Sequence, residues 1–413
     1  MASHGVARTA RITRTEEQRQ QDLDKINKYR ELEHSIRAQV SQDSYDNALF
    51  QLTSKLLRLN PEYYTIWNVR RRCLISSLLS RSLPGSSPSK ASQSGSHNDT
   101  TKPSSESSFP SSSDAIPQGP KSLTTGKSGT TVDSTACDKA RDKDPESDVH
   151  ILQSELAFTI PLLLEFPKCY WIWKYRKWVL EQAIVRLPVP VARKIWEAEL
   201  ALASKMLTKD RRNFHAWGYR RHVVAALESS SLAGKSMAED EFAYTTKMIH
   251  ADLSNFSAWH NRTQLILRVL GERGADDATR KAFLDQELDL VREALNVGPD
   301  DQSLWYYHQY LMSQIVNHDQ STIAPALTVQ ERIAYVKREI GDVKDLLEDY
   351  DGTKWIYEIL LEYSIALRQL GQRGDEDDQK EDPRKWLGMV RGLDPMRAGR
   401  WNDIEKQLDL SQQ

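Results

Sequence analysis

The sequence is poor in cysteine and has no long uninterrupted apolar run. Its 413 residues include three cysteines, Cys73, Cys137 and Cys169, which are too few and too scattered for a disulfide framework or a set of zinc ligands. No stretch reaches the roughly 18 apolar residues of a membrane-spanning helix, and the first residues lack the apolar core of a signal peptide. These absences predict a chain of a reducing compartment, the cytoplasm, with no membrane span.

An excess of charge of one sign is also missing, as are the common catalytic motifs. Lysine and arginine together number 56, against 58 aspartates and glutamates, so the chain has no overall positive field for gripping nucleic acid. The sequence contains no HExxH, paired CxxC, GxSxG or GxGxxG pattern. We therefore expect no nucleic-acid partner, and no metal or cofactor held by this chain.

What the sequence does contain is tryptophan at a regular spacing. Five segments align on Trp67, Trp173, Trp217, Trp259 and Trp305. Three residues after each tryptophan stand Arg70, Arg176, Arg220, Arg262 and then His308. Apolar residues recur 17 and 10 residues before each tryptophan and 7 after it. Because these offsets are whole helical turns, each unit is predicted to be two helices joined by a turn. The tryptophans are predicted to form the core, and the arginines to link neighbouring units by hydrogen bonds.

A period of this kind predicts the fold class. From Trp173 onward the aligned tryptophans are 44, 42 and 46 residues apart, a spacing typical of α-solenoid repeats. One hairpin cannot bury its own apolar face, so successive hairpins must stack. We therefore predict an all-α protein of the α–α superhelix type, in which Trp355 and Trp401 mark two degenerate units that close the array.

The same spacing divides the chain into segments. Residues 1–44 are predicted to be an arm and a leading helix, 45–80 the first hairpin, 150–405 the remaining hairpins, and 406–413 a tail. Residues 81–149 are rich in serine, threonine, proline and glycine. Such a segment buries too little apolar surface to offset its chain entropy, so it is predicted to be a disordered insertion.

One group of polar residues has the chemistry to bind an anion. At the start of a second helix, unpaired backbone N–H groups and the helix dipole favour negative charge. Lys168 and Tyr170 lie just before Trp173, and His215 lies close to the equivalent position of the next unit. Together they could bind a phosphate or diphosphate oxygen. A packing role for the ring is the alternative, because Tyr64, Phe214 and Phe256 recur at the Tyr170 position.

The aligned segments, with proline, an aromatic residue, tryptophan and arginine at fixed positions, resemble the repeat of the protein prenyltransferase α subunits. The resemblance covers most of residues 45–405 outside the insertion. His4-Gly5, residues 52–74 and the closing LDPMRAGRW look most like the type II branch, whose enzymes geranylgeranylate Rab GTPases. The α subunit shared by farnesyltransferase and the type I enzyme, which act on CaaX proteins, is a second candidate. A non-catalytic helical-repeat scaffold is a third.

The resemblance implies more than a fold. It implies a crescent-shaped, right-handed solenoid that surrounds a β subunit, in a heterodimer whose α subunit is inactive alone. Zinc and the lipid pocket would belong to the β subunit, and His4 could approach that zinc. Lys168, Tyr170 and His215 would be catalytic residues beside geranylgeranyl diphosphate. The substrates would be Rab GTPases, modified at C-terminal cysteines and accompanied by a Rab escort protein.

Overall fold

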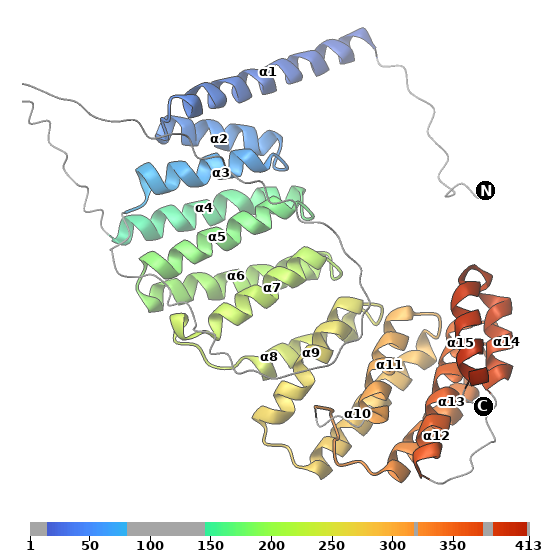
Figure 1. The fold of residues 1–413 in the computed structure, drawn as a ribbon. Coiled ribbons are helices and arrows are strands. Elements are labelled where there is room, and N and C mark those ends of the chain that lie inside the picture. Colours follow the sequence, from blue (N-terminus) through green and yellow to red (C-terminus); the bar gives the residue numbers. More distant parts are fainter. Residues whose placement is uncertain (1–14, 81–144, 318–320, 375–382, 411–413) are drawn as a thin grey trace, which may run out of the picture.

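In the computed structural model the described residues of the protein form an array of helices (Figure 1). The structure describes residues 15–80, 145–317, 321–374 and 383–410. These residues form fifteen α-helices and three short 3₁₀ or π-helical turns, and no strand occurs among them. The all-α prediction is therefore confirmed. Within the same ranges, no helix combines the length and the apolar character that crossing a bilayer requires.

Helix α1 (Glu16–Ser41) leads into seven successive helical hairpins. They pair α2 (Asn47–Leu59) with α3 (Tyr64–Cys73), α4 (Pro145–Glu165) with α5 (Tyr170–Arg186), α6 (Val189–Lys209) with α7 (Phe214–Leu227), α8 (Ala238–Ala251) with α9 (Phe256–Glu272), α10 (Asp277–Val297) with α11 (Gln302–Val316), α12 (Val329–Asp345) with α13 (Lys354–Gly374), and α14 (Pro383–Leu393) with α15 (Ala398–Leu410). The short turns are Leu74–Leu78, Ser230–Leu232 and Pro395–Arg397. The second helices α3, α5 and α7 lie side by side, as do α9, α11 and α13. The hairpins follow one another along an arc from α1 to α15 (Figure 1).

The end of the predicted insertion needs a correction. Residues 145–149 were assigned to it, but α4 already begins at Pro145. Proline is tolerated in a first helical turn, and the acidic Glu146 and Asp148 there suit the helix dipole. The Asp148 carboxylate also accepts a hydrogen bond from the backbone N–H of Ser80 at 2.9 Å, which joins the two edges of the insertion. Residues 81–144 lie outside the described residues.

The repeated tryptophans fix the turn of each hairpin. All five are buried. Each indole N–H donates to the carbonyl oxygen six residues earlier, at 2.6 to 2.9 Å, and the acceptors are Pro61, Pro167, Arg211, Leu253 and Pro299. One side chain therefore fills the core and also satisfies a carbonyl that the turn leaves free.

The repeated arginines join each hairpin to the next. Their guanidinium groups bind a glutamate on the first helix of the following hairpin, in the pairs Arg70–Glu155, Arg176–Glu199, Arg220–Glu241 and Arg262–Glu287. The closest nitrogen and oxygen atoms of these pairs are 2.5 to 2.6 Å apart, and all eight side chains are buried. Three of the glutamates also accept a hydrogen bond from a buried tyrosine of their own hairpin, namely Tyr175, Tyr219 and Tyr307. Because both charges are paired inside the protein, a shifted register between neighbouring hairpins would leave buried charges unpaired at a high cost in free energy.

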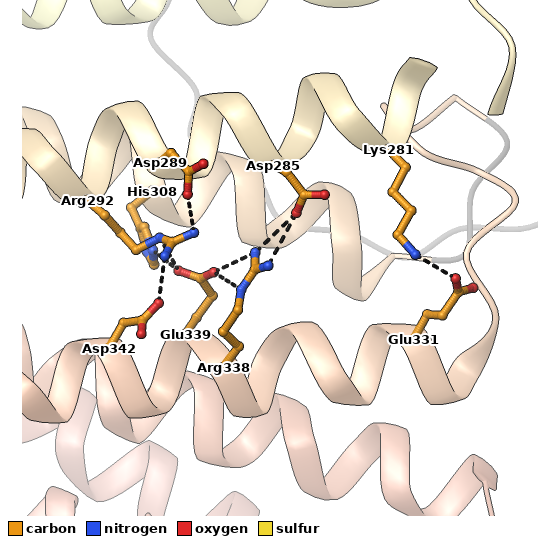
Figure 2. Close-up of polar contacts among 9 residues, drawn as sticks. All are labelled: Lys281, Asp285, Asp289, Arg292, His308, Glu331, Arg338, Glu339 and Asp342. Carbon is orange, nitrogen blue, oxygen red and sulfur yellow. Dashed lines mark hydrogen bonds and ion pairs between the residues drawn. The ribbon is translucent and has the colours of Figure 1, made fainter. Parts of the chain in front are cut away.

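The fifth junction uses histidine in place of arginine. His308 Nε2 lies 3.0 Å from Glu339 Oε2 on α12, and Nδ1 lies 2.6 Å from the hydroxyl of Tyr363 on α13. Figure 2 shows that, beside His308, charged side chains of α10 also meet charged side chains of α12. They form the pairs Lys281–Glu331 at 2.8 Å, Asp285–Arg338 at 3.3 Å and Arg292–Asp342 at 2.9 Å. Charged side chains therefore bridge the first helices of the fifth and sixth hairpins.

Candidate functional site

Two of the three residues predicted to bind an anion lie next to each other. Tyr170 is the first residue of α5 and His215 the second residue of α7, and their ring centroids are 6.2 Å apart. Lys168 lies in the turn before α5, where its side chain is 78% exposed and its Nζ is 4.0 Å from Asp210 Oδ2. Tyr170 and His215 line one cavity, whereas Lys168 is not part of its lining.

The start of α5 differs from the starts of α7 and α9, and like the start of α3 it has no side-chain cap. Asn213 caps α7 by accepting a hydrogen bond from the N–H of Ala216 at 3.1 Å, and Asn255 caps α9 in the same way. The corresponding residue before α5 is Cys169, whose side chain caps no backbone group of that helix. Its Sγ donates instead to the carbonyl oxygen of Pro61 at 3.5 Å. A thiol is a weaker acceptor than the amide oxygens that cap α7 and α9, so the first N–H groups of α5 are satisfied less well, which favours an anion at this end.

A cavity of about 410 Å³ opens between α5 and α7, beside these residues. We call it the α5/α7 cavity. Its lining includes the rings of Trp173, Trp178 and Tyr219. Gly218 lies at its edge, where an added Cβ would meet only Arg221 Nη2, at 3.9 Å. A larger residue at position 218 would narrow the opening. The cavity is therefore aromatic at its walls and open at its mouth.

The charge in this cavity is mostly positive. Arg71, Lys174 and Lys177 line it, and Glu181 is the one carboxylate among its lining residues. Burial lowers the pKa of the Lys177 ammonium, the charge of Glu181 opposes this shift, and the charge of Arg221 adds to it. Burial also lowers the pKa of His215 below its ordinary value of 6.5, so this imidazole is mainly neutral at pH 7. An anion bound here would favour the protonated form of each group.

An exposed row of rings follows the same edge of the array. Tyr64, Tyr170, Phe214 and Phe256 are the first residues of α3, α5, α7 and α9, and their exposed fractions are 52, 49, 70 and 49%. The packing alternative therefore describes these rings only in part, because about half or more of each remains on the surface. A continuous exposed aromatic row is typical of a surface that a partner covers.

Sequence reasoning did not identify three cations that follow the exposed aromatic residues along α3, α5 and α7. Arg71, Lys177 and Arg221 each stand four residues after an aligned tryptophan, so their recurrence was visible. Their common face became clear only when α3, α5 and α7 were placed side by side. His4, the fourth residue suggested by the resemblance, lies outside the described residues. Within the described ranges, no three histidine, cysteine, aspartate or glutamate side chains form a group that could hold a metal ion.

Comparison with known proteins gives a consistent family. The model of the protein prenyltransferase alpha subunit repeat matches residues 46–76, 152–183, 196–227, 238–269 and 284–315. The chain is similar to the geranylgeranyl transferase type-2 subunit alpha of Schizosaccharomyces pombe, at 29% identity over 98% of both chains. It is 30% identical to the protein of the same name from Dictyostelium discoideum, over 83% of both chains. The Saccharomyces cerevisiae protein of that name is 28% identical over 98% of this chain and 99% of its own length. The chain therefore belongs to the protein prenyltransferase alpha-subunit family, in the branch of the geranylgeranyl transferase type-2 alpha subunits.

Proposed function

We propose that this chain pairs with a β subunit to transfer geranylgeranyl from its diphosphate to C-terminal cysteines of Rab GTPases, with a Rab escort protein. The similarity over the whole length of the S. pombe relative supports an α subunit of this type. The observation that carries the assignment of the site is local. Tyr170 and His215 lie side by side where α5 begins without a side-chain cap, and Lys168 lies in the turn before it.

In this proposal the three side chains contact the diphosphate at the edge of the α subunit. Lys168 supplies a positive charge, Tyr170 a phenolic donor and His215 an imidazole donor. The first N–H groups of α5 add backbone donors in the same direction. The exposed position of Lys168 fits this role, because its weak pairing with Asp210 at 4.0 Å leaves the ammonium available to a ligand.

The chemistry of geranylgeranyl transfer determines the role that Lys168, Tyr170 and His215 would have. The cysteine thiol loses its proton, and the sulfur forms a bond to C1 of the geranylgeranyl group. The bond between C1 and the diphosphate oxygen breaks, and diphosphate leaves with the electron pair. Zinc, when held by the β subunit, lowers the pKa of the thiol. Negative charge grows on the departing diphosphate, so donors placed around it stabilise the transition state more than the bound substrate.

The test uses the chain co-expressed with its own β subunit and assayed on a Rab protein with its escort protein. Lys168→Ala should lower the single-turnover rate of transfer about 10- to 100-fold. The affinity for geranylgeranyl diphosphate should change much less, because the contact strengthens as charge develops. Lys194→Ala is the matched control, since Lys194 is an exposed lysine near the start of α6, at the opposite end of that helix from the turn before α7.

Equal transfer rates for the wild type and Lys168→Ala would contradict the role of Lys168. Activity of the wild-type complex on CaaX substrates, with none on Rab proteins, would assign the chain to the farnesyltransferase and type I branch. A chain that forms no complex with the β subunit would overturn the proposed function as a whole.

A further inference from the structure

Three cations form a line across the first three hairpins, and two of them, Arg71 and Lys177, line the same cavity as Tyr170 and His215. Arg71 on α3, Lys177 on α5 and Arg221 on α7 occupy the same position of their repeats. The three helices lie side by side. We call these residues the basic row. It does not continue along the array, because Thr263 and Gln309 stand at the corresponding positions of α9 and α11.

Positive charge exceeds negative charge around the basic row. Glu181 lines the same cavity, and its charge raises the pKa of Arg71 and of Lys177, but none of the three cations forms an ion pair among the described residues. Lys177 and Arg71 are half-buried. Arg71 donates to Asn68 Oδ1 at 2.7 Å, but its Nε is buried without a hydrogen-bond partner. Burial lowers the pKa of the Arg71 guanidinium as well as that of Lys177. Charged groups held this way are stabilised when an acidic group covers them.

The dimensions of the row favour a protein segment over a free anion. Packed helices lie about 8–10 Å apart, so the row from α3 to α7 spans roughly two such steps. One diphosphate cannot bridge that distance. The row also runs past aromatic surface, because Trp178 is half-buried beside Lys177 in the α5/α7 cavity and Phe214 is 70% exposed at its edge. Aromatic anchors next to arginines are typical of the centre of a protein interface.

We propose that the basic row and the α5/α7 cavity are the seat of an acidic segment of the β subunit, with an apolar or aromatic side chain in the cavity. This inference rests on the proposed function for the identity of the partner. To the proposed function it adds where one contact between the two subunits lies and which chemical groups form it. The segment's carboxylates would pair with Lys177 and Arg221, and the positive charge of the half-buried Arg71 would add to this attraction. Because Gly218 has no side chain, the opening of the α5/α7 cavity would stay wide enough for the segment's side chain to enter.

The first experiment measures the affinity between the subunits in the complex of the full chain with its β subunit. Charge reversal of the row in the double variant Lys177→Glu/Arg221→Glu should weaken association at least about tenfold at physiological salt. The difference from the wild type should shrink as salt rises, because screening weakens the attraction. Lys194→Glu, an exposed lysine of α6, is the control and should bind within about twofold of the wild type.

A second experiment reads the contact directly. Lysine acylation followed by mass spectrometry should show Lys177 protected in the complex relative to the free chain, while Lys194 is modified equally in both. Normal assembly and transfer with no protection of Lys177, or charge-reversed subunits that bind as tightly as the wild type, would overturn the inference and leave the proposed function intact. Inorganic diphosphate that protects Lys177 by itself would also overturn it, by assigning the row to a small anion. Failure of the wild-type subunits to associate would instead count against the proposed function.

Discussion

At the scale of single residues, the buried arginines are the most sensitive positions. Arg176 binds Glu199 through Nε at 3.0 Å and Nη2 at 2.5 Å, and donates to the carbonyl oxygen of Leu156 at 2.6 Å. Arg176→Met should lower the free energy of unfolding by about 3–5 kcal/mol, because Glu199 then stays buried without its countercharge. Urea denaturation measures this. Arg19→Met, in a pair whose side chains are 59 and 88% exposed, should cost less than about 1 kcal/mol.

A double variant separates the charge from the packing at that junction. Arg176→Met combined with Glu199→Leu should recover a large part of the loss, since no unpaired charge remains inside. If the double variant is as unstable as the single one, the damage comes from lost packing and the ion pair is not its main cause.

The cap of α5 gives a second prediction at this scale. Cys169 has φ −69° and ψ 107°, almost the backbone of the capping residue Asn213 at −64° and 100°. Cys169→Asn should therefore cap α5 and raise the free energy of unfolding by about 1 kcal/mol. In the proposed site it should also slow transfer, because the new side chain competes with diphosphate for the same N–H groups. A gain in stability with an unchanged transfer rate would show that these N–H groups do not contact the diphosphate.

At the scale of elements, the start of α12 predicts a response to acid. The Glu331 carboxylate accepts from Lys281 Nζ at 2.8 Å and from the N–H of Thr328 at 2.9 Å. These hydrogen bonds, that of Lys281 first, lower the pKa of Glu331 from 4.5 to about 2. The folded-state pKa is lower than the unfolded one, so the stabilisation is complete above about pH 4.5 and is lost as pH falls toward 2.

The variant Glu331→Gln tests this assignment by removing the titrating group. Its free energy of unfolding should lie below that of the wild type at pH 7, and the gap should narrow between pH 4.5 and 2.5. Denaturation at a series of pH values measures the gap. A gap that stays constant across this range would mean that Glu331 stabilises α12 by hydrogen bonding alone, independent of its charge.

At the scale of the whole molecule, each hairpin is stabilised mainly by its neighbours. Four of the junctions share one arrangement, a buried arginine that meets a glutamate of the next hairpin, so damage at one of them should stay local. Arg262→Met removes the pair with Glu287 between the fourth and fifth hairpins. Hydrogen exchange of the variant should be faster in α8 to α11 and unchanged in α2, α3, α14 and α15. Uniformly faster exchange would show that the array unfolds as one cooperative unit.

The site was predictable in part. Lys168, Tyr170 and His215 were found from their positions relative to Trp173 and Trp217, and their chemical role stays a prediction. The proximity of Tyr170 to His215 follows from the stacking of α5 on α7, which a regular repeat implies. The cavity beside them was not predictable, because it depends on the absent side chain of Gly218 and on how the rings of Trp173 and Tyr219 pack.

The sequence by itself determined the helices, their pairing into hairpins and the role of the tryptophans, because these depend on offsets within about thirty residues of one another. It did not determine the partners of the arginines. A glutamate stands 18 residues before Trp173, Trp217, Trp259 and Trp305, yet Arg70 meets Glu155 across 85 residues. Only tertiary structure decided that pairing, the basic row and the charged bridges from α10 to α12 (Figure 2). The physical reason is that ion pairs form between residues that are close in space. The spacing of residues within one hairpin does not show which residue of another hairpin lies beside them.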